Sequence, residues 1–175
     1  MSGRGAGDEP PPFILTLKLD SATFTRFDAL RREHFPPALN RLSAHLTLFH
    51  KLPGERQDEL AADLAAVARR APLRLRVCGL RLLGRGVAYD LESAGLSEVR
   101  RELARRWGPW LSPQDRQGFR PHVTIQNKTD PAEARLLRDR LAHSFAPWDA
   151  EGCAVQLWRY LGGPWEAEGE WPFIA

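Results

Sequence analysis

Two short segments of the chain are near copies of one another. Residues 45–51 and 122–128 both read His-aliphatic-Thr-aliphatic-x-x-Lys, and their histidines lie 77 positions apart (122 minus 45). Each copy is followed, at nearly the same distance, by a helical pattern and then by an apolar stretch that runs into a glycine turn. This pattern predicts an internal duplication, in which two equivalent halves build one site at a pseudo-twofold axis.

Strand geometry places the histidine and threonine of each copy on one face. Residues i and i+2 of an extended strand point to the same side, so His45 lies with Thr47 and His122 lies with Thr124, while aliphatic residues occupy the other face. An imidazole has an ordinary pKa of about 6.5, so one histidine can accept a proton while the other donates one. The threonine hydroxyls can hold an anion between them. We therefore expect the polar faces to line a cleft.

The motif residues resemble those of the two-histidine (2H) phosphoesterase superfamily, and within it the 2′-5′ RNA ligase-like proteins. The resemblance rests on residues 45–48 and on residues 120–125, where Arg120 and Pro121 form a lead-in typical of the second motif. It covers about residues 12–173. It implies an α/β (α+β) fold of two lobes, with two mainly antiparallel sheets forming a central cleft and helices outside. It also implies metal-free hydrolysis or transfer at phosphodiesters of nucleotides or RNA.

Hydrophobic periodicity predicts helices that alternate with strands, which agrees with this fold class. The helix at 131–143 has the clearest start, because Asp130 is a good N-cap and Pro131 suits the first helical position. The predicted strands cover residues 13–19, 44–49, 73–83, 87–91 and 121–127, with two or three short strands in 150–173, and the other predicted helices cover 22–33, 58–70 and a segment that contains Leu96, Val99, Leu103 and Trp107.

Composition limits the class of protein. The 175 residues suit one domain, predicted at 13–173, behind a flexible tail at 1–12 that is rich in Gly, Pro and charge. A net charge of +3 favours small anionic ligands or RNA ends over extended duplexes. No apolar stretch is long enough for a membrane span. Cys78 and Cys153 are expected to be buried thiols. We expect a monomer in the reducing cytoplasm.

Four further residues are candidates for substrate contact. Lys51 and Lys128 occupy matching positions and share strand parity with the histidines, so they bind phosphate or lie at solvated strand ends. Arg120 can make a bidentate phosphate contact. Phe49 stacks a base or packs in the core, the more common role.

Three other side chains receive weaker predictions. His50 has the opposite strand parity, so it is predicted to be structural. Tyr89 and Trp165 are weaker candidates for base stacking because they lie on the second arms of the two predicted hairpins.

The predicted mechanism is acid–base catalysis at phosphorus by His45 and His122, without a cofactor. No cluster of His, Asp, Glu or Cys has the spacing of metal ligands. The substrate would be an RNA end or a small nucleotide phosphodiester. Two alternatives remain: a nucleotide- or RNA-binding module with little or no catalysis, and a plain interaction protein, which the six tryptophans and basic charge would suit.

Overall fold

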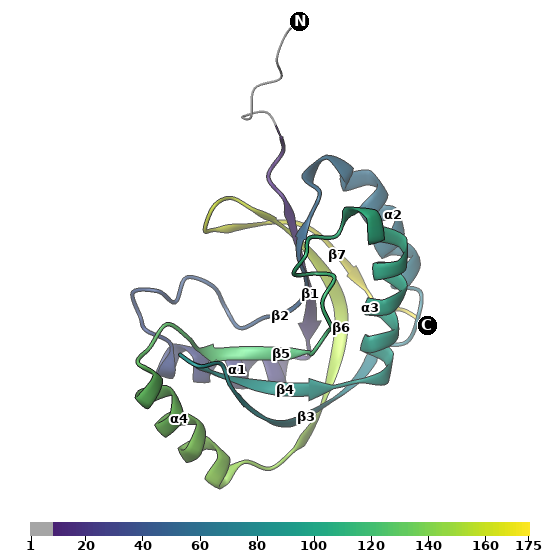
Figure 1. Ribbon diagram of the computed structural model, residues 1–175. Helices are drawn as coiled ribbons and strands as arrows, with labels where there is room; N and C mark the ends of the chain where they lie inside the picture. Colours follow the sequence, from purple (N-terminus) through teal and green to yellow (C-terminus); the bar gives the residue numbers. More distant parts are fainter. Residues whose placement is uncertain (1–8) are drawn as a thin grey trace, which may run out of the picture.

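The computed structural model describes residues 9–175, in which strands and helices alternate as predicted (Figure 1). The strands are β1 (Phe13–Leu19), β2 (Leu46–Leu52), β3 (Leu73–Leu82), β4 (Val87–Glu92), β5 (His122–Gln126), β6 (Trp148–Tyr160) and β7 (Trp165–Pro172). The helices are α1 (Ser21–His34), α2 (Gln57–Val67), α3 (Ala94–Trp107) and α4 (Pro131–Ser144), with short 3₁₀ turns η1 (Gly54–Arg56) and η2 (Gly108–Trp110).

Capping side chains define where three of these helices begin. The side chains of Asp20, Ser93 and Asp130 each accept a hydrogen bond from a backbone N–H in the first turn of α1, α3 and α4. These bonds satisfy donors that a helix start leaves without an intrahelical partner. The Asp130 cap and the Pro131 start are confirmed.

The strands form one antiparallel sheet in the order β2-β1-β6-β3-β4-β5, and β7 also pairs with β6. Strand β6 holds the sheet together. One of its edges pairs with β1, and its other edge pairs with β3 near Gly152 and with β7 farther along. The antiparallel α/β fold is confirmed, but the two predicted sheets are joined into one because the 13-residue β6 runs through both lobes.

The internal duplication is visible in the order of the elements along the chain. The series β1-α1-β2-α2-β3 is repeated as β4-α3-β5-α4-β6, and β7 is an addition. The two halves exchange their last strands. Strand β6, the last of the second half, pairs with β1 of the first half, and β3, the last of the first half, pairs with β4 of the second. The strands that carry the motifs, β2 and β5, are consequently the two ends of the sheet.

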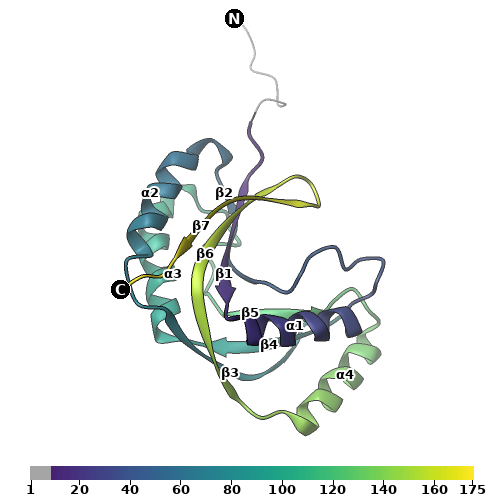
Figure 2. The same ribbon diagram turned by 180° about the vertical axis from the view of Figure 1, so that it is seen from behind.

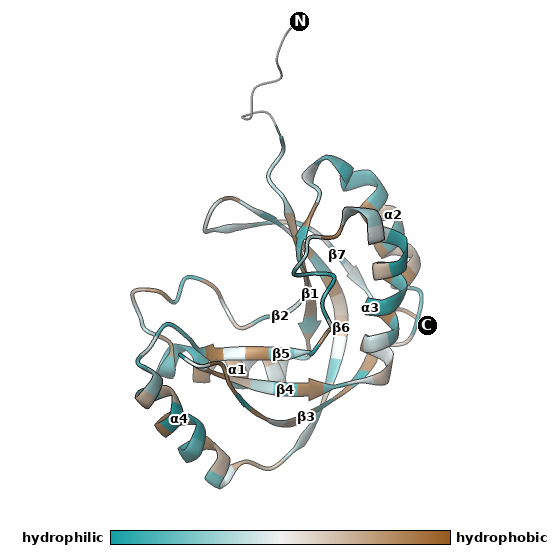
Figure 3. Ribbon diagram, viewed as in Figure 1, coloured by the Kyte–Doolittle hydropathy of each residue, from teal (hydrophilic) through white to brown (hydrophobic). Residues whose placement is uncertain are grey.

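The helices cover the outer faces of the curved sheet. Helix α1 packs on β5 and α4 packs on β3 and β4, while α2 and α3 lie together over the other lobe (Figures 1 and 2). Hydrophobic segments run along β3, β4 and β5, whereas α3 is largely hydrophilic outside (Figure 3). The predicted stripe of α3 is confirmed, because Leu96, Val99, Leu103 and Trp107 are all fully buried.

Three expectations about the ends and the thiols can be compared with the structure. The final region contains two strands, within the predicted two or three, but the first of them, β6, is long and not short. The predicted tail lies partly outside the described residues, but Pro11 and Pro12 are held by hydrogen bonds from Arg159 and Tyr160 to their carbonyls. Cys78 is exposed and Cys153 only partly buried, because the strand face opposite their apolar neighbours is open to solvent.

Candidate active site

The two motif strands lie at opposite ends of the sheet, yet β2 and β5 come into contact because the sheet curves. Their polar faces are therefore brought toward each other. The proximity extends to the side chains, since the charge of a protonated His122 lowers the pKa of His45. One site can draw on both copies of the motif.

Both motif histidines make the same local hydrogen bond. The Nδ1–H of His45 donates to the carbonyl of Ser43 at 2.8 Å, and the Nδ1–H of His122 donates to the carbonyl of Arg120 at 2.9 Å. A carbonyl oxygen only accepts, so Nδ1 must carry a proton in both rings. Nε2 is then the nitrogen with a free lone pair, and each half presents the same atom for proton transfer.

His45 lies against aromatic side chains. The ring of Trp165 is centred 4.8 Å from the imidazole, and Trp158 follows at 6.1 Å from Trp165. Burial lowers the pKa of His45 from 6.5 to about 4, and the nearby positive charge of Arg31 acts in the same direction. His45 is therefore neutral at neutral pH.

His122 lies among charged side chains. Asp90 is its partner across the β4–β5 ladder and forms an ion pair with Arg81. Burial lowers the pKa of His122, and Arg81 lowers it further while Asp90 opposes the shift. His122 is thus also biased toward the neutral form, but its surroundings are ionic and not aromatic.

A pocket with a volume of about 190 Å³ brings the halves together. Thr47 of the first motif and His122 of the second both line it. Three arginines, Arg81, Arg100 and Arg120, contribute positive charge to the same lining. Guanidinium groups, an imidazole and a hydroxyl are suited to hold a phosphoryl group.

The remaining motif residues lie around this pocket. His45 lines an adjoining apolar pocket of about 400 Å³, together with Phe24 and Trp158. His45 and Thr47 are two residues apart at one end of β2, so the motif contributes one side chain to each of the two pockets. Thr124 is partly buried and lies outside the lining of both pockets.

Two buried arginines connect each motif strand to a helix of the other half. Arg31 of α1 donates from Nη1 to the carbonyl of Thr124 in β5 at 3.0 Å. Arg100 of α3 donates from Nε to the carbonyl of Leu48 in β2 at 2.8 Å. Both arginines satisfy carbonyl groups at the open edges of the sheet, which would otherwise lack a strand partner.

The predicted orientation of His50 was wrong. Strand β2 has two register irregularities against β1, and as a result Leu48 and Phe49 are both buried while His50 and Lys51 are both exposed. Each irregularity inserts a residue and changes which face the next side chain occupies. His50 consequently lines the pocket of Thr47 and His122.

Asp115 of the loop before β5 holds His50 in place. Its carboxylate accepts hydrogen bonds from the backbone N–H groups of His50 and Lys51 and lies 3.2 Å from Nδ1 of His50. Burial would raise the pKa of Asp115, but these hydrogen bonds outweigh it and the pKa is lowered. The sequence pattern offered no signal for this contact, because the two residues are 65 positions apart.

The same irregularities remove Phe49 from the set of substrate contacts. Its side chain is fully buried, packs against Trp107 at 5.2 Å and lies under Arg100. Tyr89 is also in the core, near Phe27. The alternative role in core packing holds for both rings.

The two matching lysines are placed differently. Lys51 lines a third cavity beside the site, whereas Lys128 lies beyond the end of β5 with a positive φ of 60° and lines none of the pockets described above. A left-handed residue ends the strand, so parity no longer applies to Lys128. We leave Lys128 out of the proposed site.

Residues 9–175 contain neither a cluster of metal ligands nor a helix suited to a membrane. This part of the chain has no group of three or more His, Cys, Asp or Glu side chains arranged to hold a metal ion. Its helices are all too short or too polar to cross a membrane.

The sequence model of the 2′-5′ RNA ligase superfamily matches residues 19–164. The chain belongs to this superfamily. The resemblance drawn from the two motifs is thereby confirmed, and membership in the superfamily supports an activity of the phosphoesterase type. A comparison of this chain with curated protein sequences found no match.

Solved structures of other proteins share the superfamily member's fold. The protein TT0787 of Thermus thermophilus is 16% identical, with a TM-score of 0.65 over 93% of this chain and 97% of that one. E. coli LigT in apo form is 19% identical, with a TM-score of 0.64 over 96% of this chain and all (100%) of LigT. LigT complexed with 3′-AMP is 20% identical in the alignment, with a TM-score of 0.60 over 95% and 100% of the two chains.

Proposed function

We propose that the protein is a metal-independent phosphodiesterase that acts on RNA ends or nucleotides by acid–base catalysis of His45 and His122. The substrate would carry a 2′,3′-cyclic phosphate or a 2′-5′ phosphodiester. The observation that supports this most directly is the equivalent Nδ1 hydrogen bond of the two histidines, which leaves Nε2 free in each. Superfamily membership and the LigT complex with 3′-AMP are consistent with a nucleotide substrate.

In the proposed hydrolysis, Nε2 of one histidine takes a proton from water as the water oxygen bonds to phosphorus. The other histidine, protonated, gives its proton to the departing ribose oxygen as the P–O bond breaks. Thr47 and the arginines of the pocket stabilise charge on the phosphoryl oxygens, with Thr124 as a further candidate donor. A ribose hydroxyl in place of water would give transfer or ligation.

The lowered pKa values bear on the acid step. Burial makes the neutral form of both histidines favourable in the free protein, so one must gain a proton when substrate binds. A bound phosphate favours the imidazolium form through its negative charge. We expect a bell-shaped pH profile of kcat/KM with its maximum below pH 6.5, because burial moves the pKa values of the pair below the ordinary value of 6.5.

The test is turnover of 2′,3′-cyclic nucleotides and 2′-5′-linked oligonucleotides in excess chelator. Hydrolysis with the expected pH profile supports the proposal, and loss of activity with chelator would point to metal chemistry. Tight nucleotide binding without turnover would favour the alternative, a binding module. A crystal soaked in phosphate adds a structural check, since the anion should contact residues of both motifs.

A further inference from the structure

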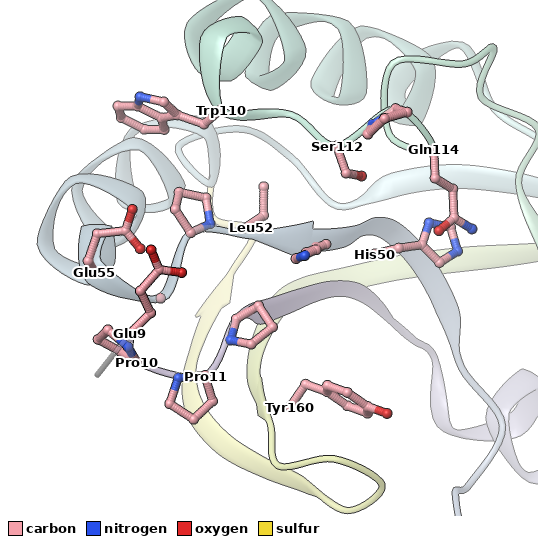
Figure 4. A pocket seen from close by; sticks show the side chains of 15 residues that line it. Glu9, Pro10, Pro11, His50, Leu52, Glu55, Trp110, Ser112, Gln114 and Tyr160 are labelled. Carbon is pink, nitrogen blue, oxygen red and sulfur yellow. The ribbon is translucent and has the colours of Figure 1, made fainter. Parts of the chain in front are cut away.

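A larger cavity opens beside the candidate active site. Its volume is about 780 Å³, and the end of β2, the loop after η2 and the segment 9–12 form its walls (Figure 4). His50 and Gln114 line both this cavity and the smaller pocket of Thr47 and His122. The two spaces therefore border the same two side chains, and we expect a ligand held in the smaller pocket to reach into the larger one.

The end of the cavity nearest the histidine pair is rich in hydrogen-bond donors. Lys51 contributes an exposed ammonium group to the lining. Asp115 receives the Nδ1–H of His50, so Nε2 of His50 remains available. Gln114 lies at the same end in Figure 4 and adds an amide. An ammonium, an imidazole and an amide that share one wall match the chemistry of a phosphate group.

The opposite end has the reverse charge. Glu9 and Glu55 lie there, away from His50 and Gln114 (Figure 4). Their carboxylates repel a second phosphate. Between the two ends, the partly exposed ring of Tyr160 offers an aromatic surface on which a base can stack. The cavity has the size of a ligand pocket. Its positive charge is confined to one end, so it suits a short ligand and not a continuous track of nucleic acid.

We propose that this cavity binds the nucleotide that precedes the one carrying the scissile phosphodiester, with the phosphate that joins the two nucleotides at His50 and Lys51 and the base of the preceding nucleotide near Tyr160. This inference rests on the proposed function and specifies its substrate class. The substrate is an RNA end of at least two nucleotides, in preference to a mononucleotide. The preference for longer RNA ends stops at the second nucleotide, because the carboxylates of Glu9 and Glu55 lie beyond it.

A substrate-length series tests the proposal. The values of kcat/KM are measured in excess chelator for mono-, di- and tetranucleotides that end in a 2′,3′-cyclic phosphate. We expect an increase of about tenfold or more from one to two nucleotides, which corresponds to one stacked base and one phosphate contact, and less than about twofold from two to four. Equal values for mono- and dinucleotide would overturn the proposal, as would an equal further gain at four.

Substitutions identify the residues responsible. His50→Gln and Lys51→Gln should each lower the dinucleotide-to-mononucleotide ratio of kcat/KM by about threefold to tenfold, and a general loss of activity cancels in that ratio. The matched controls are His143→Gln, an exposed histidine on α4, and Lys128→Gln, at the equivalent position of the second copy. Both controls should keep the wild-type ratio. An unchanged ratio in the His50 and Lys51 variants would contradict the assignment.

Binding measurements separate this inference from the proposed function. If the wild-type protein turns over no substrate of any length, the proposed function fails, but the cavity can still be tested. Calorimetry then compares the dissociation constants of the phosphorylated mono- and dinucleotide products. We expect the dinucleotide to bind about tenfold more tightly, and equal constants would reject the cavity as a nucleotide site.

Discussion

His45 and His122 share a backbone setting but differ in what surrounds them. Each ring donates its Nδ1–H to the carbonyl two residues earlier, which is what a duplicated strand would preserve. Around this common feature, His45 lies near Trp165 of β7 and Trp158 of β6, whereas His122 lies near Arg81 of β3 and Asp90 of β4. Duplication thus explains why the two imidazoles have the same backbone setting, while the different neighbours allow the two to differ in charge.

The largest expected effect tests whether both halves serve one reaction. His45→Ala and His122→Ala should each lower kcat by about 10² to 10⁴, because each removes one of the two proton transfers. The double variant should be much less than multiplicatively worse. Steady-state kinetics on a 2′,3′-cyclic mononucleotide, with His143→Ala as the control, measure this. Near-wild-type turnover in either single variant would remove that histidine from the mechanism.

The pH dependence of stability should differ between the halves. The pKa of His45 is about 4 in the folded protein and 6.5 when the ring is free in water, so the unfolded chain binds more protons between these values. The stability contribution of neutral His45 is complete above pH 6.5 and is lost as the pH falls toward 4. Because the ring is partly exposed, we expect about 1–3 kcal/mol for this loss.

Denaturant unfolding at pH 7.5 and pH 4.5 measures this contribution. The wild type should lose more stability between the two pH values than His45→Ala does, and carboxylates contribute equally to both proteins. His122→Ala serves as the comparison from the other half. If His45→Ala loses as much stability as the wild type, the lowered pKa of His45 is not a source of the pH dependence.

Arg31 and Arg100 allow a comparison of how strongly β5 and β2, the strands at the two ends of the sheet, are held by side chains. Arg31→Met and Arg100→Met should each destabilise the fold by about 1–3 kcal/mol, because buried carbonyls of β5 and β2 lose their donors. The exposed Arg32→Met and Arg101→Met are matched controls on the same helices. Thermal unfolding measures the effect, and a loss no greater than in the controls would show that these hydrogen bonds add little.

The smallest effects should be shifts in pKa that are confined to one of the two histidines. Trp165→Leu reduces the burial of His45 and should raise its pKa from about 4 toward 6.5, with His122 unchanged. Asp90→Asn removes the anion near His122 and should lower the pKa of that ring, with His45 unchanged. NMR titration of the imidazole resonances reads both. If either substitution shifts both rings equally, the surroundings are not as separate as the structure indicates.

Much of the fold could be predicted from the sequence, because hydrophobic periodicity and helix caps depend only on residues close together in the chain. The β1 strand, the α3 stripe and the Asp130 cap follow from periodicity and capping, and the duplicated motif identified the superfamily. The orientations of His50 and Phe49 were predicted wrongly, because an irregular strand changes faces without a sequence signal. The contacts of Asp115, Trp165 and Arg100 join residues that are far apart in the sequence. No regular spacing in the sequence therefore predicts them.

The exchanged last strands have a consequence for how the chain is made. Strand β1 pairs with β6 over residues 13–19 and 152–159, so this partner is synthesised only after β2, β3, β4 and β5. Until then β1 has only β2 beside it, and its inner edge offers unpaired backbone groups. A ribosome-bound fragment that lacks β6 therefore cannot complete even its first half, and the two halves are expected to fold together only after β6 has left the ribosome.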